Sequence, residues 1–189
     1  MSRRYTAIVS TEHRYVAGTA WLNLLATLGH AYGEAPIERL SGVDALREWL
    51  DHERLTPAAP VTEADVAEVR AFRETLRPLV LAVLDGRTPE VAPLQVWLDA
   101  DEPLTAVVRD GRPAAAPPST LAAALARLAR QTVEQLPDAP LRACADDECR
   151  LAYLDPGGRR RWCSPETCGV KARVRAHRAR ARVSPPTPA

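Results

Sequence analysis

The sequence predicts a mainly α-helical protein: an N-terminal helical bundle with a small β-hairpin, followed by a small metal-binding lobe. Apolar residues recur at helical spacing along most of residues 1–140, and capping residues stand where those patterns begin. All four cysteines of the chain lie farther on, within residues 141–183. Residues 184–189 are rich in proline, and we expect them to form a disordered tail.

The bundle is expected to begin with three helices. The first covers roughly residues 13–29, where valine, alanine and leucine recur every four positions. Ser41 is positioned to cap the second helix, with Asp44 in the capping-box position. Thr62 and Asp65 repeat this pattern at the start of the third helix, which is expected to run to about residue 85.

The second half of the bundle combines short helices with a hairpin. Pro78 is expected to kink the third helix, and a shorter helix is expected over residues 88–98. Residues 104–108 have the composition of a strand, and the Asp-Gly pair at 110–111 predicts a tight turn after it. Ser119 is positioned to cap a last leucine-rich helix, which leads into a short linker.

The four cysteines form two pairs, with four residues inside each pair and thirteen between them: Cys144, Cys149, Cys163 and Cys168. This spacing is typical of a tetrahedral metal site, although an even number of cysteines also allows two disulfides. No apolar stretch has the length of a signal peptide or a membrane span, so we expect a cytoplasmic protein with reduced thiols. We expect one zinc ion per chain, while the spacing alone also allows a rubredoxin-like iron site.

The residues around the cysteines predict how the metal lobe is built. Polar residues 145–148 suit a turn between the first two ligands, and residues 151–154 suit a strand. An Asp-Pro-Gly-Gly turn then leads to a return strand at 159–162. Ser164 is positioned to cap a helix whose first turn holds Cys168. Knuckle, hairpin and helix together resemble a treble-clef zinc finger.

Positive charge is concentrated at the end of the lobe. Residues 159–182 contain nine basic residues and one acidic residue, a net charge of +8, whereas residues 1–140 carry a net charge of −5. Such a split is typical of proteins that bind polyanions. The candidate nucleic-acid contacts are Arg159, Arg160, Arg161, Lys171, Arg175, Arg178 and Arg182. A solvated tail and a protein-docking surface remain alternatives.

The last helix is expected to have distinct faces. At 100° per residue, its four candidate cations share a stripe about 60° wide, with Arg173 and Arg180 on the opposite side. We expect a neighbouring apolar stripe to pack against the metal lobe; it consists of Val170, Val174, His177 and Ala181.

Three short segments of the lobe carry a family resemblance: Tyr-Leu-Asp at 153–155, Arg-Arg-Trp-Cys-Ser at 160–164 and Cys-Gly at 168–169. With them, residues 141–180 resemble the CGNR zinc finger. The family's Cys-Gly-Asn-Arg box reads Cys-Gly-Val-Lys here, because Val170 and Lys171 stand in place of asparagine and arginine. Lys171 keeps the positive charge but lacks the planar guanidinium fork.

Three segments of the N-terminal part carry a second resemblance: Leu-Asn-Leu-Leu at 22–25, Trp-Leu at 49–50 and the helix start at 61–65. Through them this part resembles the ABATE domain, which usually precedes a CGNR finger in bacterial proteins. The resemblance implies a stress-associated transcription regulator. Its expected partner is DNA, and its helical domain is expected to sense a small-molecule effector or to mediate pairing into a homodimer. We expect no membrane partner.

An enzyme is not expected, because the chain has no phosphate-binding loop, no GxSxG and no HExxH motif. Four cysteine ligands also leave a zinc ion no open position for catalysis. The alternative to a DNA-binding regulator is a protein-interaction module in which zinc only stabilises the fold. Trp21, Trp49 and Trp97 are candidates either for an effector pocket or for ordinary core packing.

Overall fold

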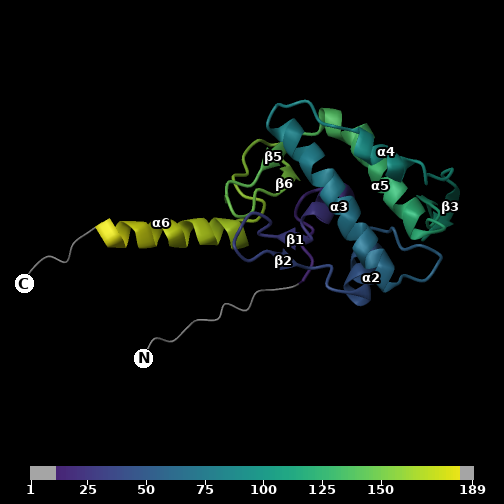
Figure 1. Ribbon diagram of the computed structural model, residues 1–189, viewed down its shortest axis with the longest axis horizontal. Coiled ribbons are helices and arrows are strands. Elements are labelled where there is room, and N and C mark those ends of the chain that lie inside the picture. The colour runs from purple at the N-terminus through teal and green to yellow at the C-terminus, as the bar shows by residue number, and fades with distance from the viewer. Residues whose placement is uncertain (1–11, 184–189) are drawn as a thin grey trace, which may run out of the picture.

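The computed structural model describes residues 12–183 of the 189-residue chain, apart from the side chains of residues 179 and 181–183. The tail expected at 184–189 therefore lies outside the described residues. The helices are α1 Ala20–Leu25, α2 Val43–His52, α3 Glu63–Leu84, α4 Ala92–Leu98, α5 Leu121–Gln135 and α6 Val170–Val183. The strands are β1 Leu28–Gly29, β2 Ile37–Glu38, β3 Ala106–Arg109, β4 Arg112–Ala115, β5 Leu141–Ala143 and β6 Ala152–Leu154. The mainly α-helical fold class is confirmed, and Figure 1 shows α6 projecting from a body formed by the other elements.

The long helix α3 runs through the middle of the body, and its start follows the sequence prediction. The backbone N–H of Thr62 donates to the Asp65 carboxylate over 2.6 Å, which completes the capping box. Val61 and Val66 are both buried on either side of this cap, as a hydrophobic staple requires. No helix in the described part of the chain is both long enough and apolar enough to cross a membrane.

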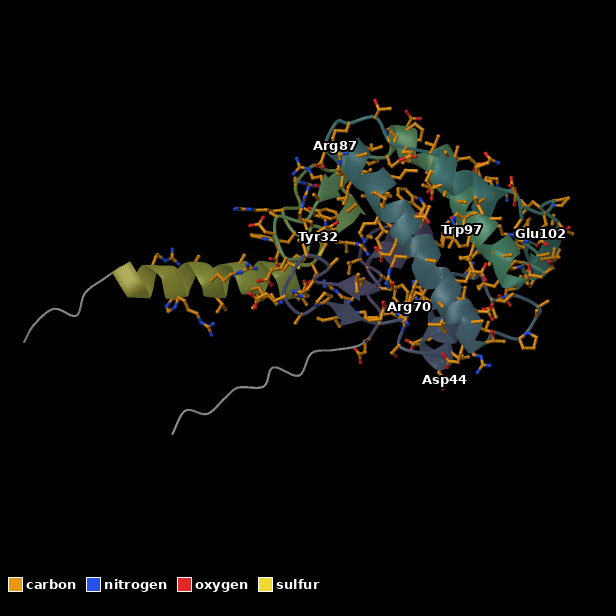
Figure 2. The ribbon with its side chains drawn as sticks, in the orientation of Figure 1. Tyr32, Asp44, Arg70, Arg87, Trp97 and Glu102 are labelled. Carbon is orange, nitrogen blue, oxygen red and sulfur yellow. The ribbon has the colours of Figure 1, made fainter. Side chains whose placement is uncertain are left out.

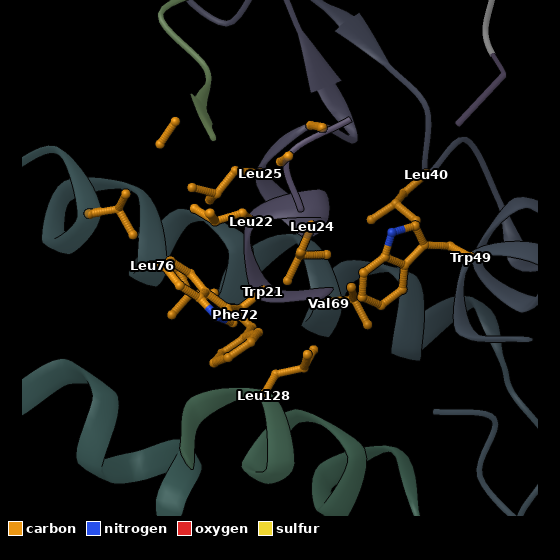
Figure 3. Packing of buried hydrophobic residues seen from close by; sticks show 14 of the residues in the cluster. Trp21, Leu22, Leu24, Leu25, Leu40, Trp49, Val69, Phe72, Leu76 and Leu128 are labelled. Carbon is orange, nitrogen blue, oxygen red and sulfur yellow. The ribbon is translucent and has the colours of Figure 1, made fainter. Parts of the chain in front are cut away.

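The core lies where α1, α3 and α5 face one another. Figure 3 shows Trp21, Phe72 and Leu128 meeting there, and all three side chains are fully buried. Trp49 is fully buried as well, and Trp97 packs edge-on against Phe72 with 5.1 Å between ring centroids. Core packing is therefore a role that the structure shows for all three tryptophans.

The metal lobe shares this core instead of standing apart from it. Tyr153 of β6 is fully buried and belongs to the same hydrophobic cluster as the tryptophans of the bundle. The Leu154 N–H donates to the Ala17 carbonyl over 2.9 Å, and the Tyr32 N–H donates to the Glu148 carbonyl over 3.1 Å. The two sequence regions that meet near residue 140 are thus packed together in space.

The first helix is shorter than the predicted range of 13–29, because α1 covers Ala20–Leu25 alone. The preceding backbone makes tertiary bonds that a helix would not allow: the Val16 carbonyl accepts from the Arg160 guanidinium, and the Ala17 carbonyl accepts from β6. Gly18, at φ +98°, then turns the chain toward α1. Tertiary contacts have therefore overridden the helical periodicity of this segment.

Three other helix starts differ from the prediction. Gly42 occupies the N-cap of α2 and makes no side-chain cap bond, so the capping box expected from Ser41 is wrong. Helix α4 begins at residue 92 rather than 88. Thr120 caps α5 by accepting from the Ala123 N–H over 3.2 Å, whereas Ser119 donates its hydroxyl to Glu102.

The hairpin of β3 and β4 has the predicted turn. Asp110 and Gly111 both have positive φ, at 51° and 73°, and they join Arg109 to its cross-strand partner Arg112. Two positive φ angles are typical of the hairpin turns that favour Asp-Gly. Strands β1 and β2 form a second, two-residue hairpin that the sequence patterns did not predict.

The return strand expected at 159–162 is absent, and β6 pairs instead with β5, antiparallel. Asp155 explains the difference, because its carboxylate accepts from the Arg160 backbone N–H over 3.0 Å. The Tyr153 hydroxyl donates to the carbonyl of the same Arg160 over 2.8 Å. These two bonds engage the backbone groups that a ladder with β6 would need.

Candidate metal centre and nucleic-acid interface

The four cysteine sulfurs converge on one point inside the metal lobe. All four Sγ atoms lie within 4.8 Å of one another, and all four residues are buried: Cys144, Cys149, Cys163 and Cys168. Sγ of Cys163 lies 3.7 Å from those of Cys149 and Cys168. Zinc–sulfur bonds of ~2.3 Å in a tetrahedron place the sulfurs ~3.8 Å apart, whereas a disulfide needs ~2.05 Å. The thiols are free, the disulfide alternative is wrong, and the cluster fits one zinc ion.

The first ligand pair is held by a tight knuckle after β5. The N–H groups of Cys149 and Arg150 both donate to the Asp146 carbonyl, over 2.8 and 2.9 Å. Arg150 has a positive φ of 41°, which reverses the chain, and the Cys144 N–H donates to the Leu151 carbonyl over 2.9 Å. These backbone bonds bring the two thiols together.

The second pair lies at the entry to α6, as the sequence predicted. Ser164 accepts from the Thr167 N–H over 3.2 Å, which caps a π-helical turn at Pro165–Gly169. This turn carries Cys168 toward Cys163. A side chain on Gly169 would begin 3.4 Å from the half-buried Trp162 ring, so the indole packs directly on the metal-binding turn.

Positive groups from the N-terminal region lie beside the thiols. Arg14 donates to Thr167 Oγ1 over 2.6 Å, and its guanidinium lies 3.9 Å from Cys163 Sγ. Arg39 is buried nearby, where burial lowers its pKa and the cysteines act in the opposite direction. Four thiolates and one Zn²⁺ leave a net charge of −2, which such guanidinium groups help to balance.

The three arginines before Cys163 have different surroundings. Arg160 is half-buried, donates to the carbonyls of Val16, Leu154 and Cys163, and lies over the Tyr153 ring at 4.4 Å. Its guanidinium is therefore engaged inside the protein, contrary to the expectation that it faces nucleic acid. Arg159 and Arg161 are exposed, as a nucleic-acid contact requires.

The basic stripe of α6 begins against the body of the protein. Lys171 Nζ lies 2.8 Å from Nε2 of His30, and Arg175 donates to the carboxylate of Asp146 over 2.5 Å. That ion pair raises the pKa of Arg175. Arg178 is exposed farther along the helix, while the side chain of Arg182 lies outside the described part of the structure.

The apolar stripe of α6 does not pack against the metal lobe, so this expectation is wrong. Val170 and Val174 are 41% and 42% exposed, and His177 is exposed as well, while the side chain of Ala181 is not described. The helix leaves the body directly after the metal-binding turn, and the side turned toward the knuckle carries Lys171 and Arg175. Figure 2 shows the outer part of α6 surrounded by open space.

Comparison with known protein families agrees with this arrangement. The family model ABATE, described as "Putative stress-induced transcription regulator", matches residues 18–139, which is more than half of the chain. The chain belongs to the ABATE family. A second model, the CGNR zinc finger, matches residues 141–181 directly after the ABATE domain. No curated protein matches the chain.

Within this ABATE protein, the Cys-Gly-Val-Lys segment at 168–171 lies where the finger meets the ABATE domain. Val170 is an exposed apolar residue at the start of α6, and Lys171 turns back to His30 at the end of β1. His30 also lies 3.5 Å from Glu148 of the knuckle. The box therefore links the zinc finger to the ABATE domain through a lysine contact.

Sequence reasoning missed several residues that complete the site. Arg14 and His30 contact the finger from the ABATE side, and neither belongs to a motif that would have singled it out. Asp146 was assigned to a polar turn, yet it is buried and binds Arg175. Asp146 and Arg175 are 29 residues apart, and no short sequence motif indicates a contact over such a separation. Such partners are therefore identified only in the folded structure.

Proposed function

We propose that this protein is a cytoplasmic, zinc-stabilised transcription regulator that binds DNA through α6. One observation carries the proposal: a helix with five described cations and no acidic residue extends from the body with most of its surface unpacked. The ABATE domain supports the regulator role, and we propose ligand sensing or pairing as its task. The zinc ion has four cysteine ligands, so we propose a structural and not a catalytic role for it.

The size and charge of α6 suit a nucleic-acid backbone. Fourteen helical residues extend over ~21 Å, enough to follow a groove for much of a helical turn. Arg173, Arg178 and Arg180 are exposed, and they form no ion pair with the described residues. Each phosphate neutralised by such a cation releases counterions, so binding through them depends strongly on salt.

The ion pairs at the base of α6 alter the expected contact set. Lys171 and Arg175 already contact His30, Asp146 and Glu148, so phosphate contacts through them would compete with groups of the protein itself. We therefore propose that the outer part of the helix makes the principal contacts. Arg159 and Arg161 add exposed positive charge on the finger.

The same ion pairs favour the second candidate function, a zinc-stabilised protein-interaction module. In that reading, α6 presents its cations and the exposed Val170 and Val174 to an acidic protein partner. The docking of Arg175 on Asp146 is a small intramolecular example of such recognition. This candidate predicts no binding to DNA at physiological salt.

Fluorescence anisotropy with a labelled duplex of mixed sequence, at two salt concentrations, tests the proposal. The informative variant replaces Arg173, Arg178 and Arg180 with alanine. We expect weaker binding and a salt slope smaller by about one to two units, because Arg178 lies on the opposite side of α6 from Arg173 and Arg180 and the three cannot all meet one phosphate backbone. A control variant removes three exposed arginines from the ABATE domain: Arg47, Arg109 and Arg112. If both variants weaken DNA binding equally, the DNA is attracted by the overall charge of the protein and not by α6. If the wild type does not bind DNA, the protein-interaction module becomes the supported function.

A further inference from the structure

The ABATE domain contains an open cleft far from α6, with a volume of about 510 Å³. The end of α2 forms one wall, Leu104 before β3 and Ala115 at the end of β4 form the second, and α5 forms the third. Figure 2 places this end of the body, marked by Glu102, opposite to the metal lobe. A volume of this size falls in the range of sites that enclose a small molecule.

The charged side chains that line the cleft are of three kinds. Glu53 accepts a hydrogen bond from the Asn23 amide over 3.0 Å. Arg127 and Arg130 are neutralised within the protein, through Glu102 at 2.9 Å and Asp101 at 2.8 Å. Arg54 on the α2 wall and Glu134 on the α5 wall also line the cleft, but neither forms an ion pair or hydrogen bond through its side chain among the described residues. The cleft therefore offers one cation and one anion that face it without partners.

Arg54 is also held in an unfavourable backbone conformation. It follows α2 with a φ of 59°, and the next N–H, of Leu55, donates back to the Leu50 carbonyl over 2.8 Å. Glycine is the residue that such a helix end favours, because a side chain is strained at positive φ. The side chain of Arg54 therefore leaves the end of α2 from a left-handed position beside the cleft.

The lining of the cleft also contains apolar side chains. Leu55 is buried at the base of the cleft, whereas Leu104 is 61% exposed although it precedes the hairpin at the cleft edge. A ligand with an apolar group could cover Leu104 while its charged groups meet Arg54 and Glu134. A simple anion or a simple cation would use only one of the two unpaired groups.

We propose that this cleft binds a small zwitterion with an apolar body, of the class of apolar α-amino acids. The ligand carboxylate pairs with Arg54, its ammonium group pairs with Glu134, and its side chain packs on Leu104. This inference assigns a binding site to the ligand-sensing role of the proposed function. Only the regulatory effect of the ligand rests on that proposed function. Binding of the ligand does not require DNA.

A chain of hydrogen bonds connects the cleft to the metal lobe. Glu53, which lines the cleft, accepts from the Asn23 amide over 3.0 Å, and Asn23 Oδ1 accepts from the Ala17 N–H over 3.0 Å. The Ala17 carbonyl in turn accepts from the N–H of Leu154 in β6 over 2.9 Å. Asn23 is buried, so these bonds join a residue of the cleft to β6 of the finger through the interior of the protein.

Isothermal titration calorimetry of the full-length zinc protein with L-leucine, L-valine and L-phenylalanine tests the site. Two analogues of leucine separate its charges: 4-methylpentanoate lacks the ammonium group, and 3-methylbutylamine lacks the carboxylate. We expect at least one amino acid to bind, and its matching analogues to bind at least tenfold more weakly. Absence of binding by all three amino acids, or equal binding by a singly charged analogue, overturns the proposal.

Variants place the binding in the cleft. Arg54→Gly removes the guanidinium and relieves the positive φ, so the variant should melt no lower than the wild type yet lose at least tenfold in affinity. Glu134→Gln should lose a similar factor, while Arg47→Ala, an exposed arginine of α2 outside the cleft, should bind normally. Wild-type affinity in both Arg54→Gly and Glu134→Gln rules out this site. Because these titrations contain no DNA, their failure and a failure of DNA binding are separate results.

Discussion

Arg175 of α6 forms an ion pair with the fully buried carboxylate of Asp146, with 2.5 Å between Nη2 and Oδ1. The main-chain carbonyl of the same aspartate accepts the two N–H groups that shape the first half of the metal site. One residue thus fixes both the zinc knuckle and the direction in which α6 leaves the body. The orientation of the proposed DNA-binding helix is coupled to the geometry of the metal site.

We predict that Arg175→Ala destabilises the zinc protein by about 1–2 kcal/mol. A fully buried pair costs ~3–5 kcal/mol when one partner is removed, but the Arg175 side chain is half exposed and this lowers the expected cost. Adding Asp146→Asn should restore most of the loss, since no buried charge then remains unpaired. Urea unfolding of the double-mutant cycle measures the coupling, and strictly additive effects contradict the prediction.

Removal of zinc is predicted to affect the whole protein. If the zinc lobe were an independent domain, loss of the metal would unfold the lobe and leave the bundle folded. Here the cysteines belong to the same core as the bundle, and β6 is bonded to the Ala17 carbonyl. Cys168→Ser should therefore abolish stoichiometric zinc and lower the melting temperature of the main cooperative transition.

Elemental analysis and differential scanning calorimetry check this outcome, with Ser164→Ala as a control that removes a cap and leaves all four ligands. We expect one zinc per chain in the wild type and in Ser164→Ala. An unchanged main transition in Cys168→Ser would show that the finger and the bundle fold independently.

A pH dependence is predicted from the pair of buried Arg73 and half-buried Glu38, which are joined by bonds of 2.7 and 2.8 Å. Burial raises the pKa of Glu38, but the hydrogen bonds and charge of Arg73 outweigh it and hold the pKa below its ordinary value. A carboxylate with a lowered pKa stabilises the folded state above the unfolded-state pKa of ~4.3 and loses this contribution as the pH falls through the folded-state value.

Glu38→Gln should accordingly lower the unfolding free energy at pH 7 and have a smaller effect near pH 3. Chemical denaturation across this range measures the difference, and Glu90→Gln provides a control at an exposed position. A constant difference between wild type and Glu38→Gln from pH 7 to pH 3 contradicts the assignment.

The parts of the structure that followed from the sequence are those fixed by neighbours in the chain. The Thr62–Asp65 capping box, the Asp110–Gly111 turn and the cysteine pairs all depend on residues a few positions apart. The failures depend on distant partners. Residues 159–162 have the composition of a strand, but the backbone N–H and carbonyl of Arg160 form hydrogen bonds with the side chains of Asp155 and Tyr153.

The basic stripe shows the same limit. Helical geometry placed Lys171 and Arg175 on one face, but it contained no information about what that face meets. His30 and Asp146 occupy the space beside it because the β1–β2 hairpin and the knuckle fold against the start of α6. A charge pattern predicts which cations share a helix face. The tertiary structure decides which of these cations already have partners within the protein.

Arg160 provides the clearest test of that distinction. Its guanidinium joins the carbonyls of Val16, Leu154 and Cys163, so it connects the segment before α1 with β6 and with a metal ligand. We predict that Arg160→Ala lowers the unfolding free energy by about 2 kcal/mol, because partly buried carbonyls lose a charged donor and Tyr153 loses its stacked cation. The exposed neighbour in Arg159→Ala should change stability by less than about 0.5 kcal/mol. Urea unfolding of the two zinc-loaded variants makes the comparison, and DNA binding should respond in the opposite order at a temperature where both are folded. If Arg160→Ala is as stable as the wild type and weakens DNA binding as Arg159→Ala does, then Arg160 is a nucleic-acid contact, as its sequence position first indicated.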